Sequence, residues 1–247
     1  MWQYLNHELN SQTPVYGDGA RFHKKMERST GLGDTSNNSV LNFPAHVGTH
    51  VDAPYHFDGS GKSLVDYPAD FWICNAPFLI ELSVDESQVI DMELCEKHFK
   101  NIPAQTDILL VKTGFEKYRN EDQKKYIFKN PGFSPDTGMW LRKNRNIKFI
   151  GFDFISLSGY QNRPLGRLAH KAFLSMESGE YGEIKNEPPI LIIEDMKLSG
   201  LRSTPDQVVC APLFFDRADG SPVTVLAHHN DSRNSDTGIG NIGTNKK

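Results

Sequence analysis

Three histidines and one aspartate fall within eleven residues in the first quarter of the chain. His46, His50 and His56 surround Asp52. Neutral imidazole and carboxylate groups are the side chains that bind borderline divalent metals such as zinc and manganese. A cluster of histidines can also arise by chance in a loop, but the carboxylate among them favours a metal site.

The residues between these side chains disfavour a helix. Gly48, Pro54 and three β-branched residues lie in this stretch, and all of them destabilise helices. We therefore expect an extended strand or strand exit, in which Gly48 lets the backbone bend so that His46 and His50 turn to one centre. His50 and Asp52 are two residues apart and point to the same side of an extended chain.

Two later residues are weaker candidates. His170 lies in the helix expected after Pro164 but off its apolar stripe, so a surface histidine and a metal ligand explain it about equally well. Glu194 ends the apolar run that begins at Ile190. There it could serve a site at the carboxyl edge of a strand, or simply face solvent.

The stretch from position 46 to position 57, HVGTHVDAPYHF, resembles a signature of the cyclase family of metal-dependent hydrolases, which includes bacterial kynurenine formamidase and isatin hydrolase. That signature reads His-x-Gly-Thr-His-x-Asp-x-Pro-x-His, and all its fixed positions are present. The resemblance runs from about Leu9 to Ala227. It includes the segments Leu9 to Asp18, Gly151 to Ser156 and Asp219 to Val223.

The resemblance implies a role for each residue of the signature. His46 and His50 would bind one metal ion, and Asp52 could bridge to a second. His56 would lie beside the metal-bound water as the general acid/base. The metal could be zinc or manganese, as one or two ions.

Three further roles follow from the resemblance. His170 and Glu194 match the later His and Glu ligand positions, with 23 residues between them. This spacing exceeds that of compact family members, so we expect an inserted surface loop at 176–188. Tyr16 is the nearest equivalent of a Trp that contacts the aromatic substrate in kynurenine formamidases.

Short apolar runs predict the strands that must position these side chains. Most runs are continuous, which is typical of strands covered on both faces. They are Ser39 to Phe43, Phe78 to Val84, Ile108 to Lys112, Ile147 to Phe152, Ile190 to Glu194, Val208 to Phe215 and Val223 to Ala227.

Helices are expected between some of these strands. One is capped by Asp91 and runs through Phe99, one runs from Ser134 to about Asn144, and one begins at Pro164. The charged segment 116–129 is expected to be a solvent-facing helix or loop. The class is therefore α/β or α+β with a mixed sheet. The resemblance implies a sheet that closes into a barrel-like core flanked by helices, of the swivelling β/β/α type.

Composition excludes several classes of protein. The 247 residues include 27 basic and 31 acidic ones, and 38% are apolar. These values exclude a disordered chain and make nucleic acid an unexpected partner. No secretory signal or apolar stretch long enough to span a membrane is visible. The three cysteines have no metal or redox spacing, so we expect a cytoplasmic protein with buried, inert thiols.

We expect one domain over 1–229 and a polar tail over 230–247, either mobile or bridging between subunits. The resemblance implies a homodimer or homotetramer that acts on a small molecule. The leading hypothesis is metal-dependent hydrolysis of a C–N bond in an amide, formamide or cyclic amide. The alternatives are a lactone-opening or polyketide-type cyclase on the same site, and a non-catalytic metal-binding protein.

Overall fold

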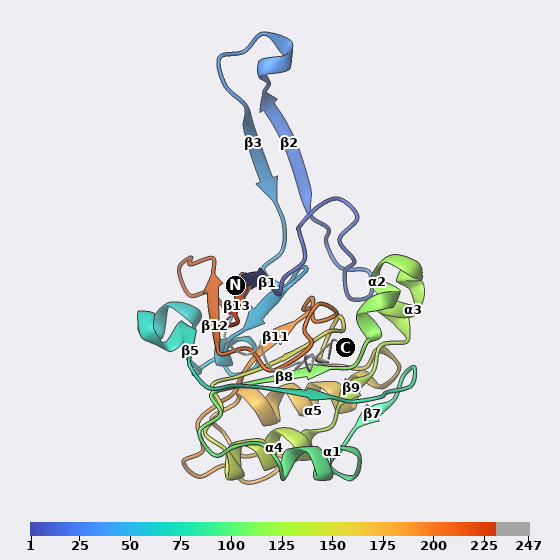
Figure 1. Ribbon diagram of the computed structural model, residues 1–247, viewed down its shortest axis with the longest axis vertical. Coiled ribbons are helices and arrows are strands. Elements are labelled where there is room, and N and C mark those ends of the chain that lie inside the picture. Colours follow the sequence, from blue (N-terminus) through green and yellow to red (C-terminus); the bar gives the residue numbers. More distant parts are fainter. Residues whose placement is uncertain (231–247) are drawn as a thin grey trace, which may run out of the picture.

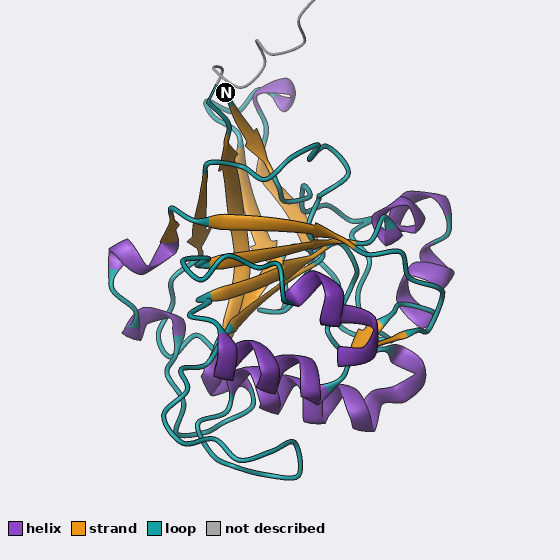
Figure 2. Ribbon diagram, turned by 60° about the horizontal axis from the view of Figure 1, so that its bottom comes forward, coloured by secondary structure: helices purple, strands orange, loops and turns teal. Residues whose placement is uncertain are grey.

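A computed structural model describes residues 1–230. The expected tail therefore lies, apart from its first residue, outside the described residues. The main element is a nine-stranded mixed sheet that curves into a nearly closed barrel, as Figures 1 and 2 show. In sheet order its strands are β5 (Ile73–Cys74), β12 (Gln207–Pro212), β13 (Gly220–His228), β4 (His50–Asp52), β11 (Leu191–Glu194), β10 (Phe149–Phe152), β8 (Ile108–Lys112) and β6 (Pro77–Glu81), with β1 (Trp2–Tyr4) paired to β13.

The sheet has a parallel half and an antiparallel half that meet at β4. Strands β6, β8, β10 and β11 run parallel to one another, whereas β4 is antiparallel to both of its neighbours, β11 and β13. The signature at 46–57 thus contains β4, the strand at which the two halves of the sheet meet.

Helices α1 (Met92–Phe99), α4 (Pro135–Asn144) and α5 (Arg163–Leu174) cover one face of the parallel half (Figures 1 and 2). The short helices α2 (Tyr118–Glu121) and α3 (Gln123–Phe128) lie at one side of the sheet. Short 3-10 turns are Thr30–Leu32, Pro54–His56, Leu64–Asp66, Ala69–Trp72, Phe115–Lys117 and Tyr160–Asn162. The predicted helix signals are confirmed: the Asp91 side chain accepts from the Leu94 amide, and a proline stands in the first turn of both α4 and α5.

The central strands are apolar throughout because each of their faces packs into a different core. In β8, Leu109 and Val111 pack with the helices, whereas Ile108 and Leu110 point into the interior of the curved sheet. Neighbouring side chains of a strand point to opposite faces. A continuous apolar run is therefore required here, as the sequence predicted.

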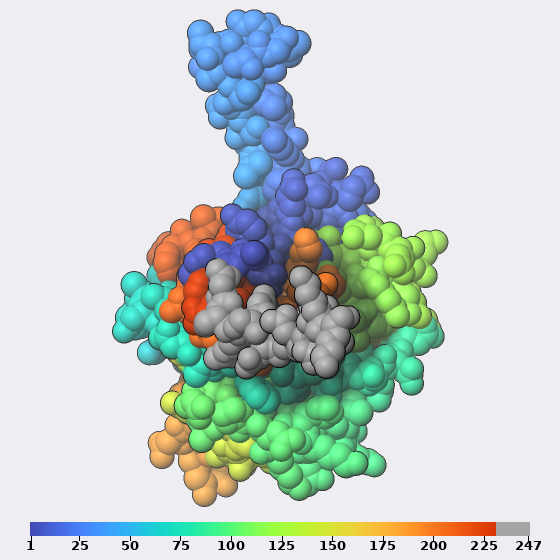
Figure 3. Space-filling model, in the orientation of Figure 1, coloured from blue at the N-terminus to red at the C-terminus, as the bar shows by residue number. Residues whose placement is uncertain are grey.

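Two predictions of burial are wrong. The run Ser39 to Phe43 forms β3 (Asn38–Asn42), which pairs only with β2 (His23–Arg28) in a hairpin that projects from the body (Figures 1 and 3). Among residues 1–230, no other strand pairs with this hairpin, and every residue of β2 is exposed. The run ending at Phe215 leaves the sheet at Pro212, and its last three residues are exposed.

The charged segment 116–129 is also less exposed than expected. It forms the short helices α2 and α3, and it buries Arg119, Tyr126 and Ile127. The small pair β7 (Val89–Ile90) and β9 (Gly132–Phe133) lies beside α1 and α4. The three thiols are free and buried, as predicted. Within residues 1–230, no helix has the length and apolarity needed to cross a membrane.

Candidate metal centre

Strand register brings the first candidate residues together. His50 of β4 lies opposite Glu194 of β11, and Asp52 of the same strand lies opposite Gly220 of β13. His50 and Asp52 occupy alternate positions and so share one face of the sheet, as predicted. Pairing within the sheet therefore joins residues that are more than 140 positions apart in the chain.

Two glycines allow the backbone to turn and to pack closely beside these side chains. Gly48 has a φ of 61°, and a Cβ there would lie 2.4 Å from Leu9 Cδ2, so this turn requires glycine. A Cβ on Gly220 would lie 2.4 Å from His46 Cε1. The expected bend between His46 and His50 is thus present, and β13 passes directly beside the His46 ring.

The first group of possible ligands is His46, Asp52 and His56. His46 Nδ1 is 2.8 Å from Asp52 Oδ1, and its Nε2 is 2.9 Å from Asp219 Oδ2. The His46 and His56 rings stack with their centroids 3.9 Å apart. His56 Nδ1 lies 3.4 Å from Asp219 Oδ2, so Asp219 contacts both imidazoles.

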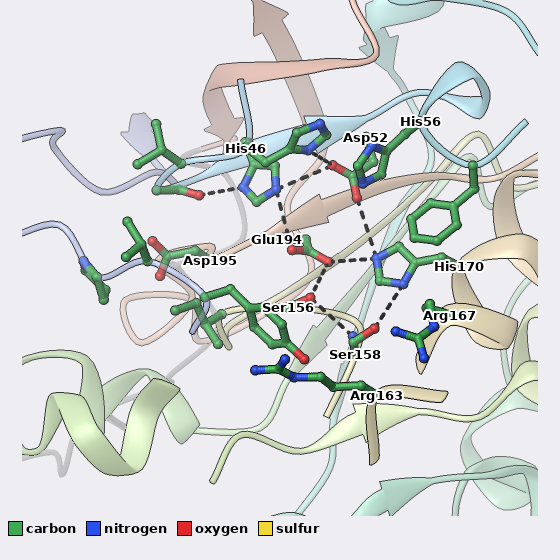
Figure 4. A pocket seen from close by; sticks show the side chains of 18 residues that line it. His46, Asp52, His56, Ser156, Ser158, Arg163, Arg167, His170, Glu194 and Asp195 are labelled. Atoms are coloured by element: carbon green, nitrogen blue, oxygen red, sulfur yellow. Dashed lines mark hydrogen bonds and ion pairs between the residues drawn. The ribbon is translucent and has the colours of Figure 1, made fainter. Parts of the chain in front are cut away.

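The second group is His50, Asp52 and Glu194, all of them buried. His50 Nε2 is 3.4 Å from both Asp52 Oδ1 and Glu194 Oε2. His170 Nε2 faces the same two carboxylates, at 3.7 Å from Asp52 and 3.5 Å from Glu194. Figure 4 shows Asp52 between the histidines of both groups.

Backbone carbonyls orient two of these imidazoles. His50 Nδ1 donates to the Gly48 carbonyl at 2.8 Å, and His170 Nδ1 donates to the Gly166 carbonyl at 2.9 Å. A carbonyl only accepts, so each Nδ1 carries a proton and each Nε2 is turned toward the carboxylates. This is the usual arrangement for a histidine that binds a metal.

The carboxylate of Glu194 is held in place from the loop that follows β10. Its Oε1 accepts from the Leu157 amide at 2.6 Å and from the Ser156 hydroxyl at 3.3 Å. The Ser158 hydroxyl lies 3.2 Å from His170 Nδ1. These contacts give both serines a structural role, since they position Glu194 and His170.

Carboxylates and burial shift the pKa values in opposite directions. Burial lowers the pKa of His46, but Asp52 and Asp219 outweigh it and raise that pKa to about 9. Burial raises the pKa of Asp52, but His46 and His50 hold it well below its usual range. His56 is different, because burial dominates there and lowers its pKa.

This shift of His46 predicts a pH-dependent stability in metal-free protein. The pKa is raised from 6.5 to about 9 on folding, so the stabilisation is complete below pH about 6.5 and is lost as the pH rises through about 9. We expect a loss of about 3 kcal/mol in the free energy of unfolding across this range, measured by urea titration with a chelator present. The His46→Gln variant should give a flatter profile, and an equally steep one would contradict this origin.

The donor set fits a divalent cation. Imidazole nitrogens and carboxylate oxygens from five buried or half-buried side chains converge, and within each group of three the ligand atoms lie within 4.8 Å of one another. Zinc and manganese both accept such mixed nitrogen and oxygen ligands. His46, His50, Asp52, His170 and Glu194 are the residues that would hold the ion, with His56 at the edge of the first group.

All the predicted site residues line one pocket of about 390 Å³. His170, which the sequence left open as a surface histidine, is buried with 5% of its surface exposed. Tyr16 and Phe57 also line the pocket. The 176–188 segment forms a largely exposed loop and contributes no lining residue to the pocket.

Three pocket or site residues were not predicted. Asp219 begins the segment that resembles the family's closing strand, and only the fold shows that it reaches His46. Arg163 and Arg167 line the pocket from α5. Arg163, Arg167 and His170 follow one another at intervals of four and three residues, which places all three on one face of a helix. The sequence alone could have shown this spacing.

Asp219 makes a testable contribution, because it contacts both His46 and His56 through one oxygen. We expect Asp219→Asn to weaken metal binding by about 10–100-fold, as is typical for partners of metal ligands. Competition with a chelator measures this change. The control is Asp216→Asn, on the exposed loop before Asp219; an effect equal to that of Asp219→Asn would contradict the assignment.

Comparison with known proteins agrees with this fold and site. A protein-family model described as putative cyclase matches residues 4–158. Cyclase-like protein 2 of Oryza sativa subsp. japonica is 30% identical over 229 residues, which cover 90% of this chain and 77% of that protein. Kynurenine formamidase of Bacillus thuringiensis (strain Al Hakam) is 26% identical over 91% of this chain and 96% of its own length.

The solved structures agree at the level of the fold. Isatin hydrolase A from Labrenzia aggregata, bound to benzyl benzoate, superposes with a TM-score of 0.72 at 23% identity, covering 92% of this chain and 93% of that one. Sheet and site together define an α/β protein with a His/carboxylate centre at the junction of its two half-sheets. The chain belongs to the cyclase family, which confirms the predicted resemblance and fold.

Proposed function

We propose that this protein is a metal-dependent hydrolase that cleaves a C–N bond in an amide, formamide or cyclic amide. The observation that carries the proposal is the position of Asp52, shared by two groups of possible metal ligands at the base of a pocket. Two relatives are kynurenine formamidases, and this chain matches nearly the whole length of each. Their names support an amide as the substrate.

When bound, a divalent cation lowers the pKa of water and polarises a carbonyl group. His46, His50, Asp52, His170 and Glu194 would hold this cation. Their own contacts pre-orient them, since the carbonyls of Gly48 and Gly166 fix the two buried imidazoles. The chain thus supplies a rigid binding site before substrate enters.

His56 is the proposed general acid/base. Asp219 lies 3.4 Å from its Nδ1, which leaves Nε2 to take a proton from water and return it to the leaving nitrogen. Burial lowers the pKa of His56, so the ring is neutral at pH 7 and ready to accept that proton. Tyr16 and Phe57 would form apolar walls for the substrate.

Several finer features belong to the same proposal. The metal is zinc or manganese, as one or two ions, and the substrate is a small molecule. The protein is a cytoplasmic homodimer or homotetramer with a single domain over 1–229. The free and buried state of all three cysteines supports a reducing compartment.

A substrate screen tests the proposal. Purified protein is assayed against formamides, cyclic amides and lactones with added zinc or manganese. We expect turnover of at least one amide class, dependent on metal. Turnover of lactones alone would replace the amide proposal with the lactone-opening alternative, and tight metal binding without any turnover would favour a non-catalytic metal-binding protein.

A further inference from the structure

Helix α5 brings two arginines to the wall of the pocket. Arg163, Arg167 and His170 follow one another at intervals of four and three residues, so they share one face of the helix. All three line the pocket. Figure 4 shows both arginines on the side of the pocket away from His46, with Arg167 beside Ser158.

Neither of these guanidinium groups has a carboxylate partner. Over residues 1–230, no ion pair joins Arg163 or Arg167 to an acidic side chain, and the polar group that Arg163 meets is the neutral Tyr16 side chain. Arg163 lies over the Tyr160 ring, 4.0 Å from its centroid. By contrast, the buried Arg119 makes a two-point contact with Asp195 at 2.8 and 3.0 Å.

The position of the two arginines is unfavourable for the helix itself. They lie in the first two turns of α5, whose first turn holds no acidic residue. The positive end of the helix dipole favours anions there, and like charges four residues apart repel each other. An anion between the two side chains would relieve both effects.

A second polar group faces the same end of the pocket. The hydroxyl oxygen of Tyr16 is buried, makes no standard hydrogen bond among the described residues, and interacts with the Arg163 side chain. The Arg163 guanidinium carbon lies 5.8 Å from the Tyr16 ring centroid. A bound anion would offer acceptors to this hydroxyl as well as to the guanidinium groups.

We propose that Arg163 and Arg167 bind a carboxylate of the substrate, so that the substrate class is an anionic aryl amide. This inference rests on the proposed amide hydrolysis for the identity of the reacting group. Along the helix axis, Arg167 and Arg163 precede His170 by about 4.5 Å and about 10.5 Å, at 1.5 Å per residue. One aromatic ring between carboxylate and amide spans such an interval, with Tyr16 and Phe57 on the pocket walls.

Binding to metal-free protein tests the anion site without catalysis. The probes are 4-aminobenzoate and its uncharged methyl ester, titrated by calorimetry into wild type and into the double variant R163Q/R167Q. We expect the dissociation constant of 4-aminobenzoate to rise at least about tenfold in the double variant, in line with the loss of charge-assisted hydrogen bonds, and that of the ester to stay unchanged.

The matched control is R202Q, which removes an exposed arginine that does not line the pocket. Equal affinities for 4-aminobenzoate in wild type and R163Q/R167Q, no binding to wild type, or the same loss in R202Q would each overturn the proposal. Circular dichroism and the melting temperature confirm that the variants are folded. R163K/R167K should restore part of the affinity, because lysine keeps the charge but loses the two-point contact.

Turnover separates this inference from the proposed function. The assay compares 4-formamidobenzoate with its methyl ester in metal-loaded protein, and we expect wild type to prefer the carboxylate at least about tenfold in kcat/KM through a lower KM. In R163Q/R167Q this preference should disappear. Turnover of both compounds without preference would contradict the anion site alone, whereas arginine-dependent binding without turnover would contradict amide hydrolysis alone.

Discussion

Asp52→Ala should remove metal binding and amide hydrolysis together. Asp52 is 1% exposed and belongs to both groups of possible ligands. One of its oxygens faces His46 and His50, at 2.8 and 3.4 Å, and the other faces His170 at 3.7 Å. Its loss leaves three imidazoles facing each other without the shared anion.

We expect metal affinity and kcat/KM each to fall by more than about 100-fold, beyond the range found when only a partner of a ligand is lost. Metal content after gel filtration and the rate of formamide hydrolysis measure the two effects. Asp70→Ala is a suitable control, because Asp70 is an exposed carboxylate remote from the pocket. Full activity in folded Asp52→Ala protein would contradict the proposed site.

His56→Ala should have the second largest effect. We expect it to lower the rate of hydrolysis and to leave metal binding largely intact. The ring stacks on His46 and keeps 29% of its surface exposed, so it stands at the open side of the site. We expect the variant to retain most of its metal and to lose about 10²–10⁴-fold in kcat, the usual contribution of general acid/base catalysis.

The structure also allows His56 to bind the metal directly, since it forms a possible ligand group with His46 and Asp52. Metal loss in His56→Ala as large as in Asp52→Ala would make His56 a ligand. Partial rescue of kcat by added imidazole, with metal content constant, would support the acid/base role. The His98→Ala variant provides a control at a helix histidine outside the pocket.

The sequence predicted the central part of the fold because its strands must be apolar on both faces. Continuous runs such as Ile108 to Lys112 appear where the sheet separates two cores. The same signal failed at Val40 and Leu41, which stand about half exposed on the projecting hairpin. An apolar run shows that a strand can form, but it does not show whether anything covers it.

The site was predictable where its residues are close in sequence or belong to the signature. Asp219 was missed because its contact with His46 spans 173 positions and depends on the pairing of β13 with β4. His170 remained ambiguous for a related reason. It lies off the apolar stripe of α5, and only the fold shows that its ring stacks on Phe57 and faces the carboxylates of Asp52 and Glu194.

The most direct test of the whole account is a titration of metal-free protein with zinc and with manganese, following bound metal and formamide hydrolysis in the same samples. We expect activity to be absent without metal and to rise in proportion to the bound ion, saturating at one or two equivalents. Hydrolysis that is independent of metal, or full occupancy without any hydrolysis of formamides or cyclic amides, would contradict it.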